Sequence, residues 1–424
     1  MERLGFFLYL VFTASWFLHL TARLPALGAV RFDLLLVVAM GIIYFIAGIR
    51  KSYSDNSSYK ALIFLIFDII VATPFAEWPG SVLKFGIPNF IKAIVFFFFT
   101  IWFVTTEKRL KIFIFVFVLC QSLRVIEPLY LHITQGYWGS MASMANWDYM
   151  YRLAGAPSDV INPNGLAFVI LTILPFLIVL FKENLLWKIM ALTVGPASLY
   201  ALYLTGSRSG MLGLVAILLI FLYQSKRKAL VAMMLIVGGL AAVLSMKGDF
   251  RDRYLSIFSS DTANAATVQG RIDGVINGFL VGLRRPIFGH GLGTSLEANA
   301  NYGDIAQISH NIYVEVFQEI GFIGLIVFLI FIWVIFKSSF DFIQNEEKSN
   351  FLLRSSQAVF IFTGMNIFFG LASYGLSGYE WYLLGGFSVV IHELLRKVED
   401  ENKSASGGTL AGRRDQDFSP LRLS

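Results

Sequence analysis

The sequence predicts an all-α integral membrane protein with about twelve transmembrane helices and one large outer loop that contains an amphipathic helix. Of the 424 residues, 56% are hydrophobic and only 15% are charged, whereas about 25% of the residues of a soluble domain are charged. Apolar runs of about 20 residues, long enough to cross a bilayer, recur along the chain. Lysine and arginine gather at the ends of alternate runs, as positive-inside orientation requires. This composition excludes a soluble globular domain.

The first predicted helix begins almost at Met1 and lacks a small-residue cleavage site, so we expect a retained span rather than a removed signal peptide. Further runs have the length and hydrophobicity of a transmembrane helix. The predicted spans cover residues 4–20, 33–50, 59–78, 87–106, 110–130, 162–181, 185–205, 209–224, 229–246, 311–337, 351–374 and 377–396.

The basic connections between these runs predict the orientation of the chain. Those connections and both termini are expected in the cytoplasm. The net charge of +6 then reflects orientation in the membrane and does not indicate a nucleic-acid partner. The basic connections lie at 50–60, 108–111, 182–188, 226–228, 337–354 and 396–397, and the outer ones at 21–32, 79–86, 131–161, 206–208, 247–310 and 377–380.

This pattern divides the chain into four parts. Residues 1–246 form the first nine helices, 247–310 form the large outer loop, and 311–396 form the last three helices. Residues 397–424 have no apolar periodicity, so we expect a disordered cytoplasmic tail.

Both long outer connections carry informative patterns. The aromatic residues of 131–161 suit an interfacial belt or a sugar-stacking surface. In 247–310, apolar residues recur at helical spacing, which predicts an amphipathic helix that lies along the membrane surface or caps the bundle. The residues of this stripe are Ile272, Val275, Ile276, Phe279, Leu280 and Leu283.

Arg208 stands between two apolar runs, at the start of the eighth predicted helix. Ser207 is a candidate N-cap, and the small residues around it leave backbone N–H groups open to an anion. Because the helix dipole disfavours a cation in a first turn, a bound phosphate would remove the conflict. The alternative is an interfacial arginine whose charge extends to the aqueous surface.

Arg271 follows Gly270 and is expected to open the amphipathic helix, so it repeats the arrangement at Arg208. Two such sites suit the two phosphates of one diphosphate. The alternative is an ion pair with Asp273 or a solvated charge. Arg284 and Arg285 lie at the other end of this helix, where cations suit the dipole, and are expected to be mainly structural.

His310 follows Ser309, a candidate cap, at the start of the tenth predicted helix. The positive end of a helix dipole favours the neutral imidazole, which can accept a proton from a hydroxyl. The alternative is an ordinary hydrogen-bonded interfacial histidine, but His310 shares the predicted outer face with Arg208 and Arg271. His290, between two glycines, is interpreted as a turn residue.

Other residues inside the spans give weaker signals. Asp68 lies within the third span, where a carboxylate suits proton coupling in a transporter or a buried hydrogen bond. Gly321 and Gly324 are expected to allow another helix to approach closely, and Cys120 to be a small core residue. The sequence contains no Cys/His metal spacing, phosphate-binding loop or dinucleotide fingerprint, so neither a metal nor another cofactor is expected.

Several of these motifs occur together, in order, over roughly residues 160–340. As a set they resemble the O-antigen ligase and polymerase superfamily. The motifs are Thr205-Gly206-Ser207-Arg208-Ser209-Gly210, Gly270-Arg271-Ile272-Asp273, Pro286-Ile287-Phe288-Gly289-His290-Gly291-Leu292-Gly293, and Ser309-His310-Asn311-Ile312-Tyr313 followed by Glu319-Ile320-Gly321-Phe322-Ile323-Gly324.

The resemblance implies a C-type membrane fold and a metal-independent inverting glycosyltransferase of the bacterial inner membrane. Such enzymes move a glycan from undecaprenyl diphosphate to an acceptor hydroxyl on the periplasmic face. Arg208, Arg271 and His310 match the family's catalytic positions, and Ser207, Arg208 and Arg271 are expected to bind the donor diphosphate.

The acceptor remains open at this stage. A ligase that transfers O-antigen to lipid A-core is the leading hypothesis. A repeat-unit polymerase and a protein O-glycosylating relative share the same donor chemistry. A transporter or flippase is the alternative from another class, suggested by Asp68 and the number of spans, although no paired broken spans support it.

Overall fold

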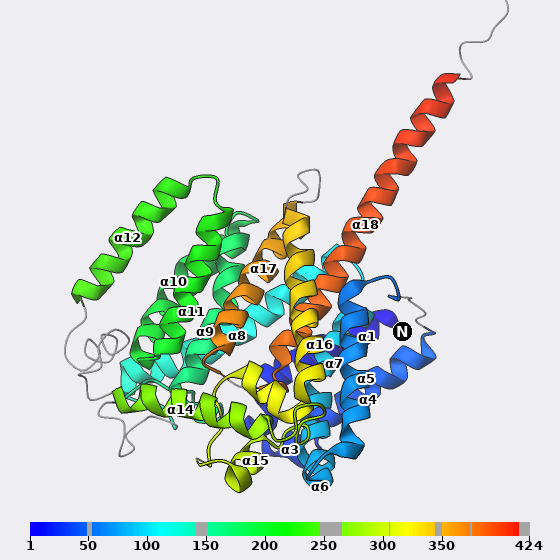
Figure 1. Cartoon of the computed structure of the whole chain (residues 1–424). Coiled ribbons are helices and arrows are strands. Elements are labelled where there is room, and N and C mark those ends of the chain that lie inside the picture. The colour runs from blue at the N-terminus through cyan, green and yellow to red at the C-terminus, as the bar shows by residue number, and fades with distance from the viewer. Residues whose placement is uncertain are drawn as a thin grey trace, which may run out of the picture.

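The computed structural model describes residues 1–48, 53–140, 151–245, 265–304, 306–343, 350–373 and 375–414, and within these ranges the regular structure is helical (Figure 1). Short helices and turns connect a bundle of long helices. The long helices are α1 Glu2–Phe17, α4 Phe32–Ile46, α5 Ser57–Ala72, α7 Ile87–Phe103, α8 Glu107–Gln135, α9 Pro163–Leu180, α10 Leu185–Thr205, α11 Arg208–Gln224, α12 Lys228–Ser245, α14 Ala265–Gly282, α16 Ile312–Ile343, α17 Asn350–Gly370 and α18 Tyr379–Arg414. The short ones are α2 Leu20–Arg23, α3 Pro25–Ala29, η1 Thr73–Phe75, α6 Pro79–Ser81, η2 Val82–Gly86 and α15 Ser295–Tyr302.

Within the described residues, 6 helical segments are long and apolar enough to cross a membrane, which identifies an integral membrane protein. A helix lies at each predicted span, but some are too short or too polar to meet the same criterion, so the number twelve stays a prediction. The 6 segments are Ser57–Phe75, Pro79–Phe103, Glu107–Gln135, Pro163–Leu180, Leu185–Thr205 and Ile312–Ile343.

Aromatic packing ties the N-terminal helix to the middle of the bundle. The rings of Phe12 and Phe17 in α1 lie 5.4 and 5.7 Å from that of Phe96 in α7, and all three side chains are buried. The buried Tyr9 hydroxyl lies 2.8 Å from Thr100 Oγ1. Such pairing is required where lipid surrounds the bundle, because no water can satisfy the hydroxyls.

α16 is interrupted at Gly321, whose φ of 73° lies in the left-handed region. A Cβ atom here would lie 2.0 Å from the carbonyl oxygen of Ile287. The Phe322 amide donates to Pro286 O at 2.7 Å in place of a helical partner. The prediction that another helix packs at Gly321 is therefore wrong, because the backbone of the preceding loop takes this place.

The loop before α15 satisfies the carbonyl groups that this break exposes. The amides of His290 and Gly291 donate to the carbonyls of Gln318 and Glu319, both at 2.9 Å. Buried backbone groups need such partners. The first part of α16 and the loop 286–293 consequently form one unit.

Gly324 lies beside α5, which agrees with the predicted close approach of a helix. A Cβ atom at Gly324 would lie 2.7 Å from Asp68 Oδ2. That carboxylate oxygen is buried and has no hydrogen-bond partner among the described residues. Asp68 thus faces the protein interior at the contact between α5 and α16.

α14 lies across one end of the bundle, roughly perpendicular to the long helices, and packs against α16 (Figure 1). The predicted amphipathic helix is thus confirmed as a helix. Its apolar stripe faces outward, and about half of each side chain at Ile272, Ile276, Phe279 and Leu280 is exposed. This arrangement matches a helix that lies along the membrane surface more closely than one that caps the core.

α18 continues as a helix to Arg414, over part of the residues 397–424 for which the sequence predicts a disordered tail. Glu and Lys are favourable helix residues, and extending an existing helix needs no new nucleation. Residues 415–424 lie outside the described part.

In 131–161, Trp138 packs on His132 with ring centroids 4.3 Å apart. Residues 141–150, including Trp147 and Tyr149, lie outside the described ranges.

Candidate functional site

The start of α11 forms the first part of the site. α10 ends at Gly206, where φ is 54°, and Ser207 begins the next helix by accepting a hydrogen bond from the Gly210 amide at 3.1 Å. This contact confirms the predicted N-cap. Arg208 is the first residue of α11 and is only 8% exposed. The chain therefore holds a buried arginine at a helix N-terminus, where backbone amides favour anions.

Arg271 lies within α14 and not at its start. The helix extends back at least to Ala265, so the predicted first-turn position is wrong, because the residues before Gly270 are themselves helical and a single glycine inside a helix is tolerated. The Gln307 side-chain amide donates to Gly270 O at 2.9 Å and ties α14 to the segment before His310. Asp273 accepts from Gln269 at 2.7 Å.

His310 precedes α16 in a left-handed conformation, with φ of 54°. Asn311 and not Ser309 caps the helix, because its Oδ1 accepts from the amides of Tyr313 and Val314 at 3.0 and 3.1 Å. Left-handed φ values are rare for a residue with a side chain and concentrate at functional sites. The sharp turn directs the chain so that His310 lies outside the helix that it was predicted to open.

Burial lowers the pKa of the His310 imidazole below its ordinary value of 6.5, and the positive charge of Arg271 lowers it further. Both effects disfavour the charged form. The expected neutral imidazole thus has a different cause from the helix dipole on which the prediction relied.

Arg271 and His310 line the same pocket, of about 220 Å³. α14 forms one wall, and Leu371 and Ala372, just after α17, form the other. The same two residues also line a larger apolar groove of about 760 Å³ between α11, α16 and α17. Ser209, next to Arg208, lies in that groove. The structure therefore brings Arg271 and His310 into one pocket, whereas Arg208 lines neither of these two cavities and only its neighbour Ser209 reaches the groove.

His290 fastens the loop that precedes α15. Its Nδ1 lies 2.7 Å from Glu77 Oε2, and its Nε2 lies 2.9 Å from Val281 O. Burial raises the pKa of Glu77, but hydrogen bonds from Tyr302 and His290 outweigh this effect and lower it below its ordinary value. His290 is a loop residue, as interpreted, with a fully buried side chain.

Part of the chain is similar to a known protein family. Residues 196–329 match the family model described as O-antigen ligase. Over this segment the chain is similar to the O-antigen ligase family. Members of this family are glycosyltransferase-like enzymes that act as ligases or polymerases. No curated protein matches the chain.

The matched segment includes Arg208, Arg271 and His310. It also includes two buried carboxylates on α16 that the sequence reasoning did not single out. Glu315 accepts from the Gly375 amide at 2.6 Å, and Glu319 accepts from the Gly293 amide at 2.8 Å. Two carboxylates four residues apart inside an apolar span are a signal that could have found them.

Glu315 supports the pocket wall at Leu371 and Ala372, which lies outside the matched residues 196–329. The Gly375 amide that it binds follows Leu371 and Ala372 closely in the chain, and the Asn311 side chain donates to Leu371 O at 3.3 Å. Among the described residues, no group of three or more His, Cys, Asp or Glu side chains could hold a metal ion.

Proposed function

We propose that the chain is a metal-independent inverting glycosyltransferase that moves a glycan from undecaprenyl diphosphate to an acceptor hydroxyl on the periplasmic face, as an O-antigen ligase acting on lipid A-core. The observation that carries this proposal is the adjacency of two pockets. The pocket that holds the cationic Arg271 and the imidazole of His310 shares Leu371 and Ala372 with a larger apolar groove. Undecaprenyl diphosphate likewise consists of a charged diphosphate bonded to an apolar isoprenoid chain.

The groove suits the lipid chain of the donor. It extends from Ser209 near the outer ends of the helices to Tyr223 and Lys337 further along them. Its walls are mainly aliphatic and aromatic side chains, so an isoprenoid chain would bury its surface there without stranding polar groups. The residues from the three helices include Leu212, Val215, Leu219, Trp333, Phe336, Phe340, Phe360 and Phe368.

The arginines suit the diphosphate. In the transfer, the acceptor oxygen bonds to the anomeric carbon, the bond from that carbon to the diphosphate oxygen breaks, and undecaprenyl diphosphate leaves with the electron pair. Arg208 and Arg271 would stabilise the charge that develops on the leaving group. His310 would accept the proton of the acceptor hydroxyl, since the imidazole is held in its neutral form.

The test of this proposal is transfer by the purified protein in lipid, with a defined undecaprenyl-diphosphate glycan as donor. Arg208→Ala and Arg271→Ala should each lose about 1.5–3 kcal/mol or more of transition-state stabilisation, because each removes a charge-assisted contact, and lysine should restore little because it binds as a point charge. Arg284→Ala is the matched control, since Arg284 lies over the Tyr302 ring at 5.0 Å, outside the pocket lining. Normal transfer by folded Arg208→Ala and Arg271→Ala proteins would refute the proposal.

A deletion strain distinguishes the ligase from the polymerase alternative. Loss of a ligase should leave long glycan chains on the carrier lipid and lipopolysaccharide without O-antigen. Unpolymerised single repeats would instead indicate a polymerase.

A further inference from the structure

The outer segment 151–162 contains a buried arginine behind the start of α11. Arg152 is 4% exposed, and the residues that follow it are held by backbone hydrogen bonds. The Leu153 amide donates to Leu204 O at 2.9 Å, and the Ala154 amide donates to Trp138 O at 2.7 Å. The segment therefore lies directly against the end of α10, next to the turn that leads to Arg208.

Arg152 contacts both sides of this turn. Its Nε donates to Thr205 O at 2.8 Å, and its Nη2 donates to Asn164 Oδ1 at 2.8 Å. The Ser207 hydroxyl donates to the same Asn164 oxygen at 2.8 Å. Since Ser207 caps α11, one guanidinium fixes the residues that come immediately before Arg208. A planar, forked donor is suited to holding two acceptors in a fixed relation.

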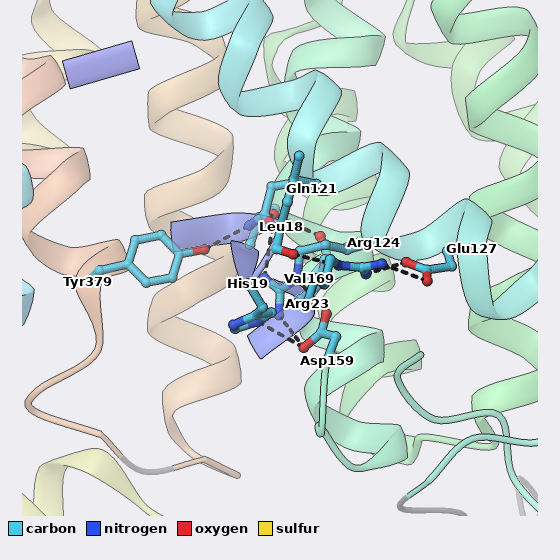
Figure 2. Close-up of polar contacts among 10 residues, drawn as sticks. Leu18, His19, Arg23, Gln121, Arg124, Glu127, Asp159, Val169 and Tyr379 are labelled. Carbon is cyan, nitrogen blue, oxygen red and sulfur yellow. Dashed lines mark hydrogen bonds and ion pairs between the residues drawn. The ribbon is translucent and has the colours of Figure 1, made fainter. Parts of the chain in front are cut away.

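A second buried arginine anchors the other end of the segment (Figure 2). Arg124 in α8 donates to both oxygens of Asp159, at 2.6 and 3.0 Å, and His19 lies 3.0 Å from Asp159 Oδ1. Burial alone would raise the pKa of Asp159, but the hydrogen bonds and charges of His19 and Arg124 lower it to about 2. Asp159 is therefore charged throughout the physiological pH range, so its ion pair with Arg124 persists over that range.

The anchor also reaches α18. Arg124 Nη1 donates to Gln121 Oε1 at 2.9 Å, and Gln121 Nε2 donates to the Tyr379 hydroxyl at 2.7 Å, as Figure 2 shows. The segment that carries Arg152 is thus fixed to α8 and, through it, to the first residue of α18. Its position relative to α11 is set by buried contacts at both ends.

We propose that Arg152 is a positioning residue of the donor site: it holds the Thr205–Ser207 turn and Asn164 so that Arg208 meets the donor diphosphate. This inference rests on the proposed function and adds a residue to it. Removing the guanidinium leaves Thr205 O and Asn164 without these donors, so the cap and Arg208 lose their fixed relation. Displacing a catalytic group by about 1 Å can cost about 10²-fold in rate.

The test is a double-mutant cycle on purified protein in lipid with a defined undecaprenyl-diphosphate glycan. Arg152→Ala should raise the KM for the donor at least about 10-fold and leave the KM for the acceptor unchanged. The double variant Arg152→Ala/Arg208→Ala should be no worse than Arg208→Ala alone, because residues that act through one another are not additive. Arg152→Lys should recover only part of the loss, since one ammonium cannot reproduce the fork.

Two further variants keep the result interpretable. Asn164→Ala removes the acceptor shared by Arg152 and Ser207, so it should raise the donor KM in the same way. If Arg152→Ala does not fold, the donor KM of Asn164→Ala tests the positioning role instead. Glu127→Gln is the control, because it changes the half-buried ion pair with Arg23 in the same region and leaves Arg152, Asn164 and Ser207 in place. Its donor KM should be unchanged.

The outcomes separate the two proposals. If Arg208→Ala weakens donor binding while Arg152→Ala leaves the donor KM unchanged, or adds its full effect to that of Arg208→Ala, the role of Arg152 is refuted and the proposed function stands. If Arg208→Ala itself leaves donor binding intact, the donor site of the proposed function is wrong, and the positioning role fails with it.

Discussion

His310 and Arg271 show how neighbouring side chains divide the chemistry of a site. Both line one small pocket, and the cation disfavours protonation of the imidazole. A neutral imidazole can accept a proton, while a guanidinium can only donate hydrogen bonds. The pair therefore offers the base and the positive charge that the proposed transfer requires.

Removal of the base should impair turnover and spare donor binding. His310→Ala is expected to leave donor affinity nearly intact and to reduce the single-turnover rate by about 10²–10⁴-fold, the usual loss for a general base. Arg208→Ala should weaken donor affinity itself. Measuring donor affinity and single-turnover rate separately for both variants provides the check. If His310→Ala loses affinity as severely as Arg208→Ala while its bound-state rate survives, His310 binds the diphosphate and is not the base.

The lowered pKa of His310 predicts a pH profile. A base whose pKa lies below its ordinary value of 6.5 is neutral and active above that pKa, and its activity falls as the pH drops through it. The midpoint of kcat/KM for the acceptor should therefore lie below pH 6.5. In Arg271→Gln, the residual activity should show a higher midpoint, because the neighbouring charge is gone, whereas Arg271→Lys should keep the low one. An unchanged midpoint in Arg271→Gln would exclude this electrostatic coupling.

At the scale of elements, the break in α16 arranges the loops next to the candidate site. The interruption at Gly321 makes room for the backbone at Ile287, and the outer part of the helix carries Glu315 and Glu319, which bind the loops on either side. α14 then lies over this unit with Arg271 toward the pocket. A continuous α16 would have no place for the loop 286–293.

Gly321→Ala tests this relation. The alanine would have to adopt a left-handed φ, which costs about 1–3 kcal/mol, and its Cβ would meet Ile287 O at 2.0 Å. The variant should unfold at a clearly lower temperature in detergent and lose transfer activity. Gly195→Ala in α10 is the control, because no atom lies within 4 Å of its added Cβ, and alanine favours a helix by up to about 1 kcal/mol. Equal melting temperatures for the two variants would show that the break is not required.

At the scale of the molecule, the candidate site lies at one end of a helical bundle that the membrane surrounds. α14 and α15 are at that end, and α18 extends away from the opposite one (Figure 1). This separation of the two ends is expected if the lipid-linked donor is used on one face of the membrane and the basic connections lie on the other face.

Cysteine labelling tests this orientation. Because Cys120 is the one cysteine of the chain, a Cys120→Ala background allows single probes to be introduced. Asn301→Cys on α15 should react with an impermeant reagent in cells whose outer membrane is permeabilised, and Lys226→Cys should react only after lysis. The opposite pattern would place the Arg271–His310 pocket in the cytoplasm and exclude a periplasmic transfer reaction.

The sequence by itself determined features that depend on neighbouring residues. Hydrophobic run length indicated the helices, apolar periodicity indicated α14, and the small residues around Ser207 indicated the cap of α11, because each is set within a few turns of chain. Motif order then pointed to the family that the comparison supports.

Only the tertiary structure decided features that depend on residues far apart in the chain. Arg152 contacts Thr205, Arg124 contacts Asp159, and Glu315 contacts Gly375, each across dozens of residues. No local pattern specifies such partners, since a buried charge is stable only where folding brings the opposite group to it. The break at Gly321 likewise follows from the loop 286–293, because the Ile287 carbonyl oxygen lies where a Cβ atom at Gly321 would be. The sequence therefore supplied the reactive residues, and packing around them decided how they meet.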